Sequence, residues 1–195
     1  MSLLRPAWRV LCVAALILAS APAMAGTEPM AQLVPGHSRI DFVSKQMGVP
    51  VEGQFRKFDA QVAFDPKQPE GGTVALQIDM ASATLGVPQS DAELPKAPWF
   101  DTARFPKASF QSSAIRSLGG GRFEIAGRLT LKGQTQELVV PVTITQSADR
   151  STAAGSFTIQ RLAFKVGEGE WADTAMIGDE VQVRFKLVLA GLRPL

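Results

Sequence analysis

Side chains that could carry acid–base or metal chemistry are few and scattered in this sequence. His37 is the only histidine, and it follows Pro35-Gly36 near the start of the chain. A metal site needs several ligands and a nucleophile needs an adjacent base, so we interpret His37 as structural or exposed. Glu168 and Glu170 are close in sequence, but their glycine-rich surroundings are typical of a solvated turn. The pattern predicts a protein that is not an enzyme, with no metal and no cofactor.

Phosphate-binding motifs are also missing from the sequence. Gly119-Gly120-Gly121 lacks both a strand-to-helix context and a following Lys-Ser/Thr pair, so it is interpreted as a hairpin turn. No dinucleotide-binding fingerprint and no Cys-His haem attachment motif occur.

Arg161 is the charged residue that the pattern directs toward the interior. Alternation from Phe157 and Ile159 places Arg161 on their face of a strand. A buried charge is costly unless it is paired, and we therefore expect a salt bridge to a carboxylate. The alternative is contact with a phosphate or carbonyl oxygen of a ligand, which suits a planar guanidinium.

The first 25 residues have the pattern of a secretory signal peptide. Arg5 and Arg9 precede a short apolar run, and Ala23-Met24-Ala25 supplies small residues around a cleavage site. We therefore expect an exported protein with one domain over residues 26–195 and no integral membrane segment after cleavage.

Cleavage at this point would change the composition that matters. Two of the 20 Lys and Arg residues would leave and none of the 18 Asp and Glu residues, so the charges would balance. A neutral chain gives no reason to expect a nucleic acid partner. The only cysteine, Cys12, would leave too, and a chain without disulfides depends on its core.

The clearest structural signal is a hairpin over residues 122–145. Apolar residues alternate with polar ones on both sides of Lys132-Gly133, which is typical of two half-buried strands and a turn. A two-residue turn would pair Leu131 with Gln134 and bring the two apolar faces together. A four-residue loop would also keep these faces together, whereas an odd-numbered loop would need a bulge to do so.

Period-two alternation indicates six further strands. We expect them over residues 38–45, 54–64, 73–80, 107–115, 152–165 and 180–190, with a bulge near Arg56-Lys57. Residues 26–35 are expected to be a frayed arm, and Gly48, Pro50 and Gly53 to break the chain.

The alternation is lost over residues 82–106. A short helix is expected over residues 89–96, followed by Trp99 and Phe100. Together with Trp171, these aromatic residues could gate one end of a barrel or cap its core.

The prediction is an all-β protein, an eight-stranded antiparallel barrel with a short helix or loop between strands three and four. Closure removes the two exposed sheet edges, and eight strands enclose side chains or one small ligand. Small inward residues, including Ala60, Ala108, Ala114 and Gly127, favour an open interior. Alternatively, six inward phenylalanines could fill it.

Several ordered motifs resemble the YceI-like family. They are Gly53-Gln54-Phe55, Phe64-Asp65-Pro66, Trp99-Phe100-Asp101, the run from Phe105 to Phe110 and the run from Gly127 to Gly133. The resemblance implies a periplasmic lipocalin-like barrel that binds polyisoprenoid or related amphipathic lipids. The chain has Ser90 where the family often has an arginine before the aspartate matching Asp91, and Lys165 where a glycine is usual.

Two hypotheses follow. The first is a non-catalytic periplasmic protein that sequesters or carries a polyisoprenoid or quinone-like lipid inside the barrel. The second is a solid barrel that docks a membrane or electron-transfer partner. The sequence leaves a homodimer open. The candidate ligand-binding residues are Phe42, Phe58, Val62, Leu76, Ile78, Phe110, Ile125, Leu129, Phe157, Arg161, Val183 and Phe185.

Overall fold

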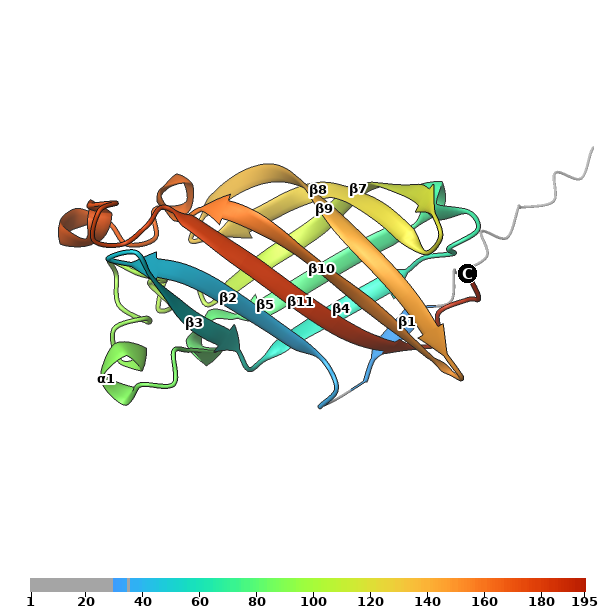
Figure 1. Cartoon of the computed structure of the whole chain (residues 1–195), viewed down its shortest axis with the longest axis horizontal. Helices are drawn as coiled ribbons and strands as arrows, with labels where there is room; N and C mark the ends of the chain where they lie inside the picture. Colours follow the sequence, from blue (N-terminus) through green and yellow to red (C-terminus); the bar gives the residue numbers. More distant parts are fainter. Residues whose placement is uncertain (1–29, 35) are drawn as a thin grey trace, which may run out of the picture.

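The structure is a computed structural model that describes residues 30–34 and 36–195. Their strands belong to one continuous antiparallel sheet (Figure 1). The expected signal peptide lies outside the described residues. The first strands are β1 (Met30–Leu33), β2 (Arg39–Gln46), β3 (Val49–Phe55), β4 (Phe58–Ala63), β5 (Thr73–Asp79) and β6 (Ala83–Thr84). The remaining strands are β7 (Lys107–Gly119), β8 (Arg122–Leu131), β9 (Gln134–Ser147), β10 (Arg150–Gln160) and β11 (Glu180–Ala190).

These segments build the predicted closed eight-stranded antiparallel barrel. The sheet runs β1-β4-β5-β7-β8-β9-β10-β11, and pairing of β1 with β11 closes it. β2 pairs with the part of β11 that β1 does not reach. β3 pairs with β2, and β6 pairs with β3. We call each of the eight strand positions around the barrel a stave. Three staves consist of two consecutive shorter strands: β1 and β2 form one, β3 and β4 another, and β5 and β6 a third.

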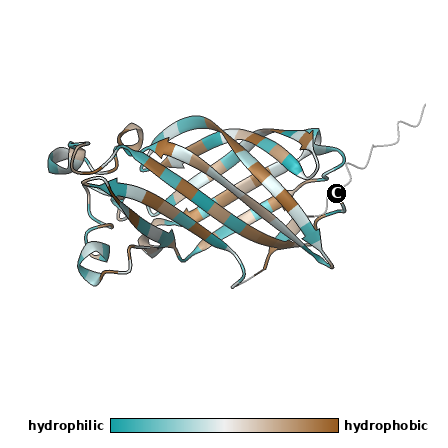
Figure 2. Cartoon of the chain, in the orientation of Figure 1, coloured by the Kyte–Doolittle hydropathy of each residue, from teal (hydrophilic) through white to brown (hydrophobic). Residues whose placement is uncertain are grey.

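Hydrophobic and polar residues alternate along the staves, as Figure 2 shows by colour. The inward set includes Ala60, Val62, Leu129, Val140 and Leu187, all of which are buried. The two-residue period therefore explains why these segments form strands with one apolar face.

The predicted hairpin is confirmed residue by residue. Leu131 pairs with Gln134, Gly127 with Leu138, and Phe123 with Val142. Lys132 and Gly133 have φ values of 47° and 73°, which matches the twist of the flanking strands. The last strand, β11, has the predicted bounds of residues 180–190.

Two expectations for the first staves are wrong. Residues 30–33 are not frayed, because β1 pairs with both β4 and β11. Gly48 and Pro50 do not end the sheet either, since Met47-Gly48 is a tight turn between β2 and β3. The expected irregularity at Arg56-Lys57 is the break between β3 and β4.

Three expectations elsewhere also need correction. Ser113 is an extra residue in β7, and this bulge turns Ala114 outward and Ile115 into the core. The strand expected over residues 152–165 ends at Gln160, where a 3-10 turn, η3 (Arg161–Phe164), begins. The expected helix is only α1 (Pro88–Asp91), one turn long.

Phenylalanine rings cover glycines on the barrel wall. Phe185 and Phe42 lie directly across the sheet from Gly155 and Gly53, and their rings fill the space that a Cβ would occupy. Phe110 covers Gly127 in the same way. Gly127 therefore does not leave space open, as its small size suggested, but receives a neighbouring ring.

Replacing one of these glycines should destabilise the barrel. In Gly155→Ala the new Cβ would collide with the Pro141 carbonyl oxygen and lie 2.7 Å from Phe185 Cζ. We expect a loss of about 1–3 kcal/mol in the free energy of unfolding, measured by urea denaturation.

Gly71→Ala is the matched control. Gly71 lies in the 3-10 turn η1 (Pro69–Gly71), outside the left-handed region, and a Cβ there meets nothing within 4 Å. Its stability should stay within about 0.5 kcal/mol of the parent chain. Equal losses in both variants would contradict the close packing of Phe185 on Gly155.

Candidate functional site

Two adjacent cavities occupy the barrel interior. The first has a volume of about 260 Å³ and the second about 120 Å³. Ile78, Leu129, Phe157 and Val183 line both, so these four side chains form the constriction between them. Taken together, the cavities reach the lower end of the roughly 300–1,000 Å³ typical of small-molecule sites.

The second cavity is lined by apolar residues throughout. Leu192, which follows β11, closes part of it together with Phe64 and Leu189. The C-terminal segment is held in place by an ion pair from Arg193 to Asp65, 2.7 Å long. Gln146 adds hydrogen bonds to Arg193 and Leu195.

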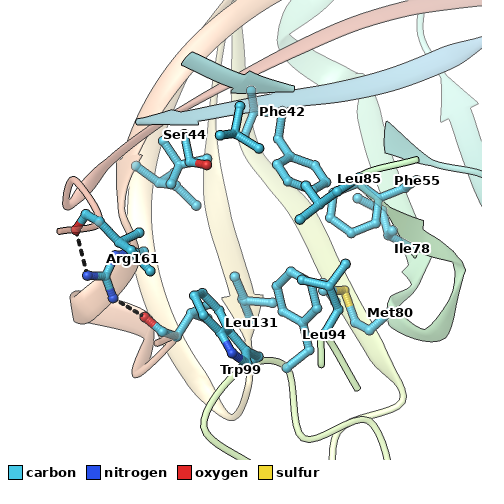
Figure 3. Close-up of a pocket in the computed structure, with 18 of the residues that line it drawn as sticks. Phe42, Ser44, Phe55, Ile78, Met80, Leu85, Leu94, Trp99, Leu131 and Arg161 are labelled. Carbon is cyan, nitrogen blue, oxygen red and sulfur yellow. Dashed lines mark hydrogen bonds between the residues drawn. The ribbon is translucent and has the colours of Figure 1, made fainter. Parts of the chain in front are cut away.

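The first cavity carries the polar groups. Ser44, Gln46, Ser90, Glu93 and Arg161 line it alongside apolar side chains. Because Gln46 and Glu93 are exposed, this cavity reaches the molecular surface. Figure 3 shows Phe42 and Ser44 on one side, Trp99 and Leu131 on the other, and Arg161 at one end.

Arg161 organises the loops around this cavity. It is 2% exposed, and all five of its N–H donors are used by backbone carbonyls. Nε donates to Gly178, Nη1 to Val166 and Gly167, and Nη2 to Trp171 and Ile177, over 2.7–3.1 Å. The partners are therefore carbonyls rather than the expected carboxylate.

Burial lowers the pKa of Arg161 from its ordinary value, and the negative charge of Asp179 partly opposes that shift. Arg161 nevertheless stays protonated, because an arginine loses its proton only in strongly basic solution. The guanidinium is thus a fixed positive group whose hydrogen-bonding capacity is used up within the protein.

Lys132 fastens the same end of the barrel from the β8–β9 turn. It is buried, and its Nζ donates to the carbonyls of Lys165 at 2.5 Å and Pro98 at 3.3 Å. Glu168 lies 3.3 Å from the same nitrogen. Sequence reasoning assigned Lys132 only to the turn, since no periodicity signals a side chain that folds back over the barrel end.

The connection after β5 supplies the other wall of the first cavity. Asp91 accepts hydrogen bonds from the Thr84 hydroxyl and the Leu85 N–H, both at 2.6 Å. These two bonds, the hydroxyl first, lower the pKa of Asp91 from its ordinary value. Trp99 packs near Trp171, with ring centroids 5.7 Å apart, and both line the cavity with Phe100.

Most candidate ligand-binding residues surround these cavities. Phe42 and Arg161 line the first, and Ile78, Leu129, Phe157 and Val183 line both. Val62, Leu76, Phe110, Ile125 and Phe185 line the second. Phe58 lines neither and packs against the core. Whether any of these residues contacts a ligand stays a prediction.

Sequence reasoning missed several residues that line the first cavity. Ile159 and Val181 share the inward face of Phe157 and Val183 in the alternation, but they were left out of the candidate ligand-binding set. Leu94, Val166 and Ile177 lie in irregular segments, where no period marks the inward side.

Within the described residues, no three His, Cys, Asp or Glu side chains are grouped to hold a metal ion. No helix among them has the length and apolar character needed to cross a bilayer. His37 is exposed, near the turn between β1 and β2.

Sequence comparison supports the family resemblance. The YceI-like domain matches residues 32–189. A UPF0312 protein of Azotobacter vinelandii is 32% identical over 133 residues, covering 66% of this chain and 69% of the relative. A UPF0312 protein of Vibrio cholerae is 30% identical over 105 residues, and the alignment covers 53% of this chain and 56% of the relative.

Solved structures show the same fold. Burkholderia cenocepacia BcnA is 44% identical with a TM-score of 0.78, covering 80% of this chain and 98% of BcnA. A polyisoprenoid binding domain from Saccharophagus degradans is 16% identical with a TM-score of 0.66, covering 84% of this chain and 98% of that domain.

Arg161→Lys should loosen the loops around the first cavity. Lysine has three donors on one atom and cannot reach five carbonyls spread around a planar fork. We expect a loss of about 2–4 kcal/mol in unfolding free energy. Hydrogen exchange should rise within residues 162–179, with the far end of the barrel unchanged.

Arg116→Lys is the control, because Arg116 lies on the outer wall and pairs with Glu124 in solvent. Its stability should change by less than about 0.5 kcal/mol. If the amide hydrogens of residues 162–179 exchanged at the same rate in Arg161→Lys as in the parent chain, the organising role of Arg161 would be refuted.

Acid should release the segment that Asp91 holds. A carboxylate with a lowered pKa stabilises the fold fully above its unfolded value near 3.8, and this stability is lost as pH falls through the folded pKa. The acid-induced fluorescence change near Trp99 that follows protonation of Asp91 should therefore be absent from Asp91→Asn, which lacks the carboxylate at every pH. An unchanged acid profile would argue that these two hydrogen bonds contribute nothing.

Proposed function

This chain belongs to the YceI-like family, and from that membership we propose that it binds a long isoprenoid lipid inside its barrel. We further propose that it works in the periplasm and sequesters or carries its ligand without chemical change. The observation that supports binding most directly is the pair of adjacent cavities, one wholly apolar and one with polar groups toward the surface. These cavities count against the alternative of a solid docking barrel.

The polarity of the two cavities orients the ligand. An apolar tail entering the second cavity would gain about 0.8 kcal/mol for each CH₂ removed from water. A polar head would stay in the first cavity beside Ser44, Gln46 and Ser90. The Saccharophagus domain, described as polyisoprenoid-binding, shares this fold and lends the isoprenoid assignment support by analogy.

The charges around the first cavity favour a neutral head group such as a quinone. Among the residues that line it, Arg161 has no donor left for a phosphate, and the Glu93 carboxylate is paired with Lys96 at 2.6 Å. An anionic diphosphate would lose its water shell there without gaining a cationic partner, which is costly. Hydroxyl and amide side chains can instead serve a carbonyl or hydroxyl head.

Native mass spectrometry tests the proposal directly. The chain should be exported in a bacterium, purified from the periplasm without detergent, and analysed before and after organic extraction. An extractable added mass of a neutral prenyl lipid is expected. The same spectrum reports whether the chain forms a homodimer.

Loading the extracted protein separates the head-group question from the binding question. A prenyl quinone should bind at least about tenfold more tightly than the polyprenyl diphosphate of equal chain length, since the diphosphate finds no free cation. Tighter binding of the diphosphate would refute the neutral head group. If neither lipid bound, the lipid-binding function itself would be wrong.

Filling the first cavity should block binding. Ala108 is buried on β7 and lines this cavity, so Ala108→Phe places a ring where the ligand would lie. We expect quinone affinity to fall at least about tenfold, with thermal stability kept because the ring fills existing space. Ser109→Phe adds the same ring on the exposed face of β7 and should bind normally. Normal binding by a folded Ala108→Phe protein would place the ligand elsewhere.

A further inference from the structure

Two neighbouring turns expose large apolar side chains at the end of the barrel where the first cavity lies. Met47 is 73% exposed, Val49 64% and Met176 47%. The Met47 N–H donates to the Met176 carbonyl over 2.7 Å, which joins the β2–β3 turn to the loop before β11. We call these three residues the apolar tip.

The fold itself does not require a methionine at position 47. Met47 and Gly48 have φ values of 48° and 79°, a left-handed pair for which asparagine and glycine are the favoured residues. A long apolar side chain in this conformation is uncommon, and here it buries little surface. Folding of the isolated chain therefore does not explain the methionine at this position.

The apolar tip forms part of the rim of the first cavity. Gln46 and Ile177, which adjoin Met47 and Met176, both line that cavity and pair with each other across the two turns. Figure 1 shows the β2–β3 turn and the segment before β11 at the same end, opposite the C-terminus. A ligand that enters the first cavity from this end would pass the apolar tip.

Charge identifies the kind of surface that fits this rim. Residues 46–51 and 174–178 contain no Asp, Glu, Lys or Arg, although charged residues make up 19% of the whole chain. An uncharged apolar projection suits the interior side of a lipid headgroup layer, where methionine and valine leave water. A proposed ligand with an isoprenoid tail resides in that same layer.

We propose that the apolar tip inserts into a lipid bilayer and seats the opening of the first cavity on the membrane. The ligand then moves between bilayer and barrel without exposing its tail to water. This inference rests on the proposed lipid-binding function and adds the surface through which loading occurs.

The test compares a triply substituted protein, which lacks the apolar tip, with a doubly substituted control. Met47→Asn/Val49→Thr/Met176→Ser removes the apolar tip, and asparagine suits the left-handed position, so folding should be retained. Leu118→Asn/Val139→Thr is the control, since it removes exposed apolar side chains from the turn end of β7 and from the outer wall of β9.

Two measurements follow for each protein. The first is flotation with vesicles of phosphatidylethanolamine and phosphatidylglycerol. The second is the rate at which the protein extracts a prenyl benzoquinone from those vesicles, followed by quenching of Trp99 and Trp171, which line the first cavity. Removing the tip should reduce both by about tenfold or more, whereas the control should match the parent chain.

Quinone added from ethanol, with no vesicles present, keeps the two proposals distinguishable. The tip variant should then bind with parental affinity. Extraction at the parental rate by the tip variant would overturn the membrane-docking proposal while leaving lipid binding intact. The proposal would also be overturned if the control protein lost as much vesicle binding as the tip variant. Failure of every protein to bind quinone from ethanol would refute the proposed function instead.

Discussion

The hollow interior depends on phenylalanine rings that lie against glycines in the barrel wall. An eight-stranded barrel is narrow enough for ordinary side chains to fill it. The rings of Phe42, Phe110 and Phe185 line the cavities, and each lies over a neighbouring glycine of the barrel wall. The core therefore gains the burial of three aromatic rings and still keeps space for two cavities. Filling and openness, which looked like alternatives in the sequence, are reconciled by where the rings lie.

At the open end of the barrel, two buried cations, Arg161 and Lys132, stabilise the loops. The loops there are irregular, and irregular backbone leaves carbonyls without strand partners. Arg161 and Lys132 donate to seven of these carbonyls, and so fix the segments around Trp99 and Trp171 without a disulfide. The same arrangement removes both cations from any role toward a ligand. The site consequently has a rigid rim and little free positive charge, which is what a neutral amphipathic ligand requires.

Sequence periodicity predicted the barrel well because each regular strand reports its own inward side. Face parity limited the hairpin to a two-residue turn or a four-residue loop, and the structure has the two-residue turn. Ala114 was misplaced because nothing in the sequence marks Ser113 as a bulge. Arg161 faces the interior as predicted, but its expected carboxylate partner was wrong, because its strand ends one residue earlier and backbone carbonyls converge on it only in the folded chain. β1 was missed for a related reason: a four-residue strand is too short for alternation to stand out.

The two ends of the barrel differ in a way that would give movement of the proposed ligand a direction. At one end Leu192 and the ion pair between Arg193 and Asp65 hold the C-terminal segment across an apolar cavity. At the other end polar side chains line a cavity that reaches the surface beside Met47. If the proposed ligand enters tail first, it gains burial at each step inward, and its head arrives where hydroxyl and amide groups can receive it. Release of the ligand would reverse that path. The head group would leave first and reach the membrane interface before the tail left the barrel. One opening can thus serve for both loading and release, provided that the opening faces a membrane.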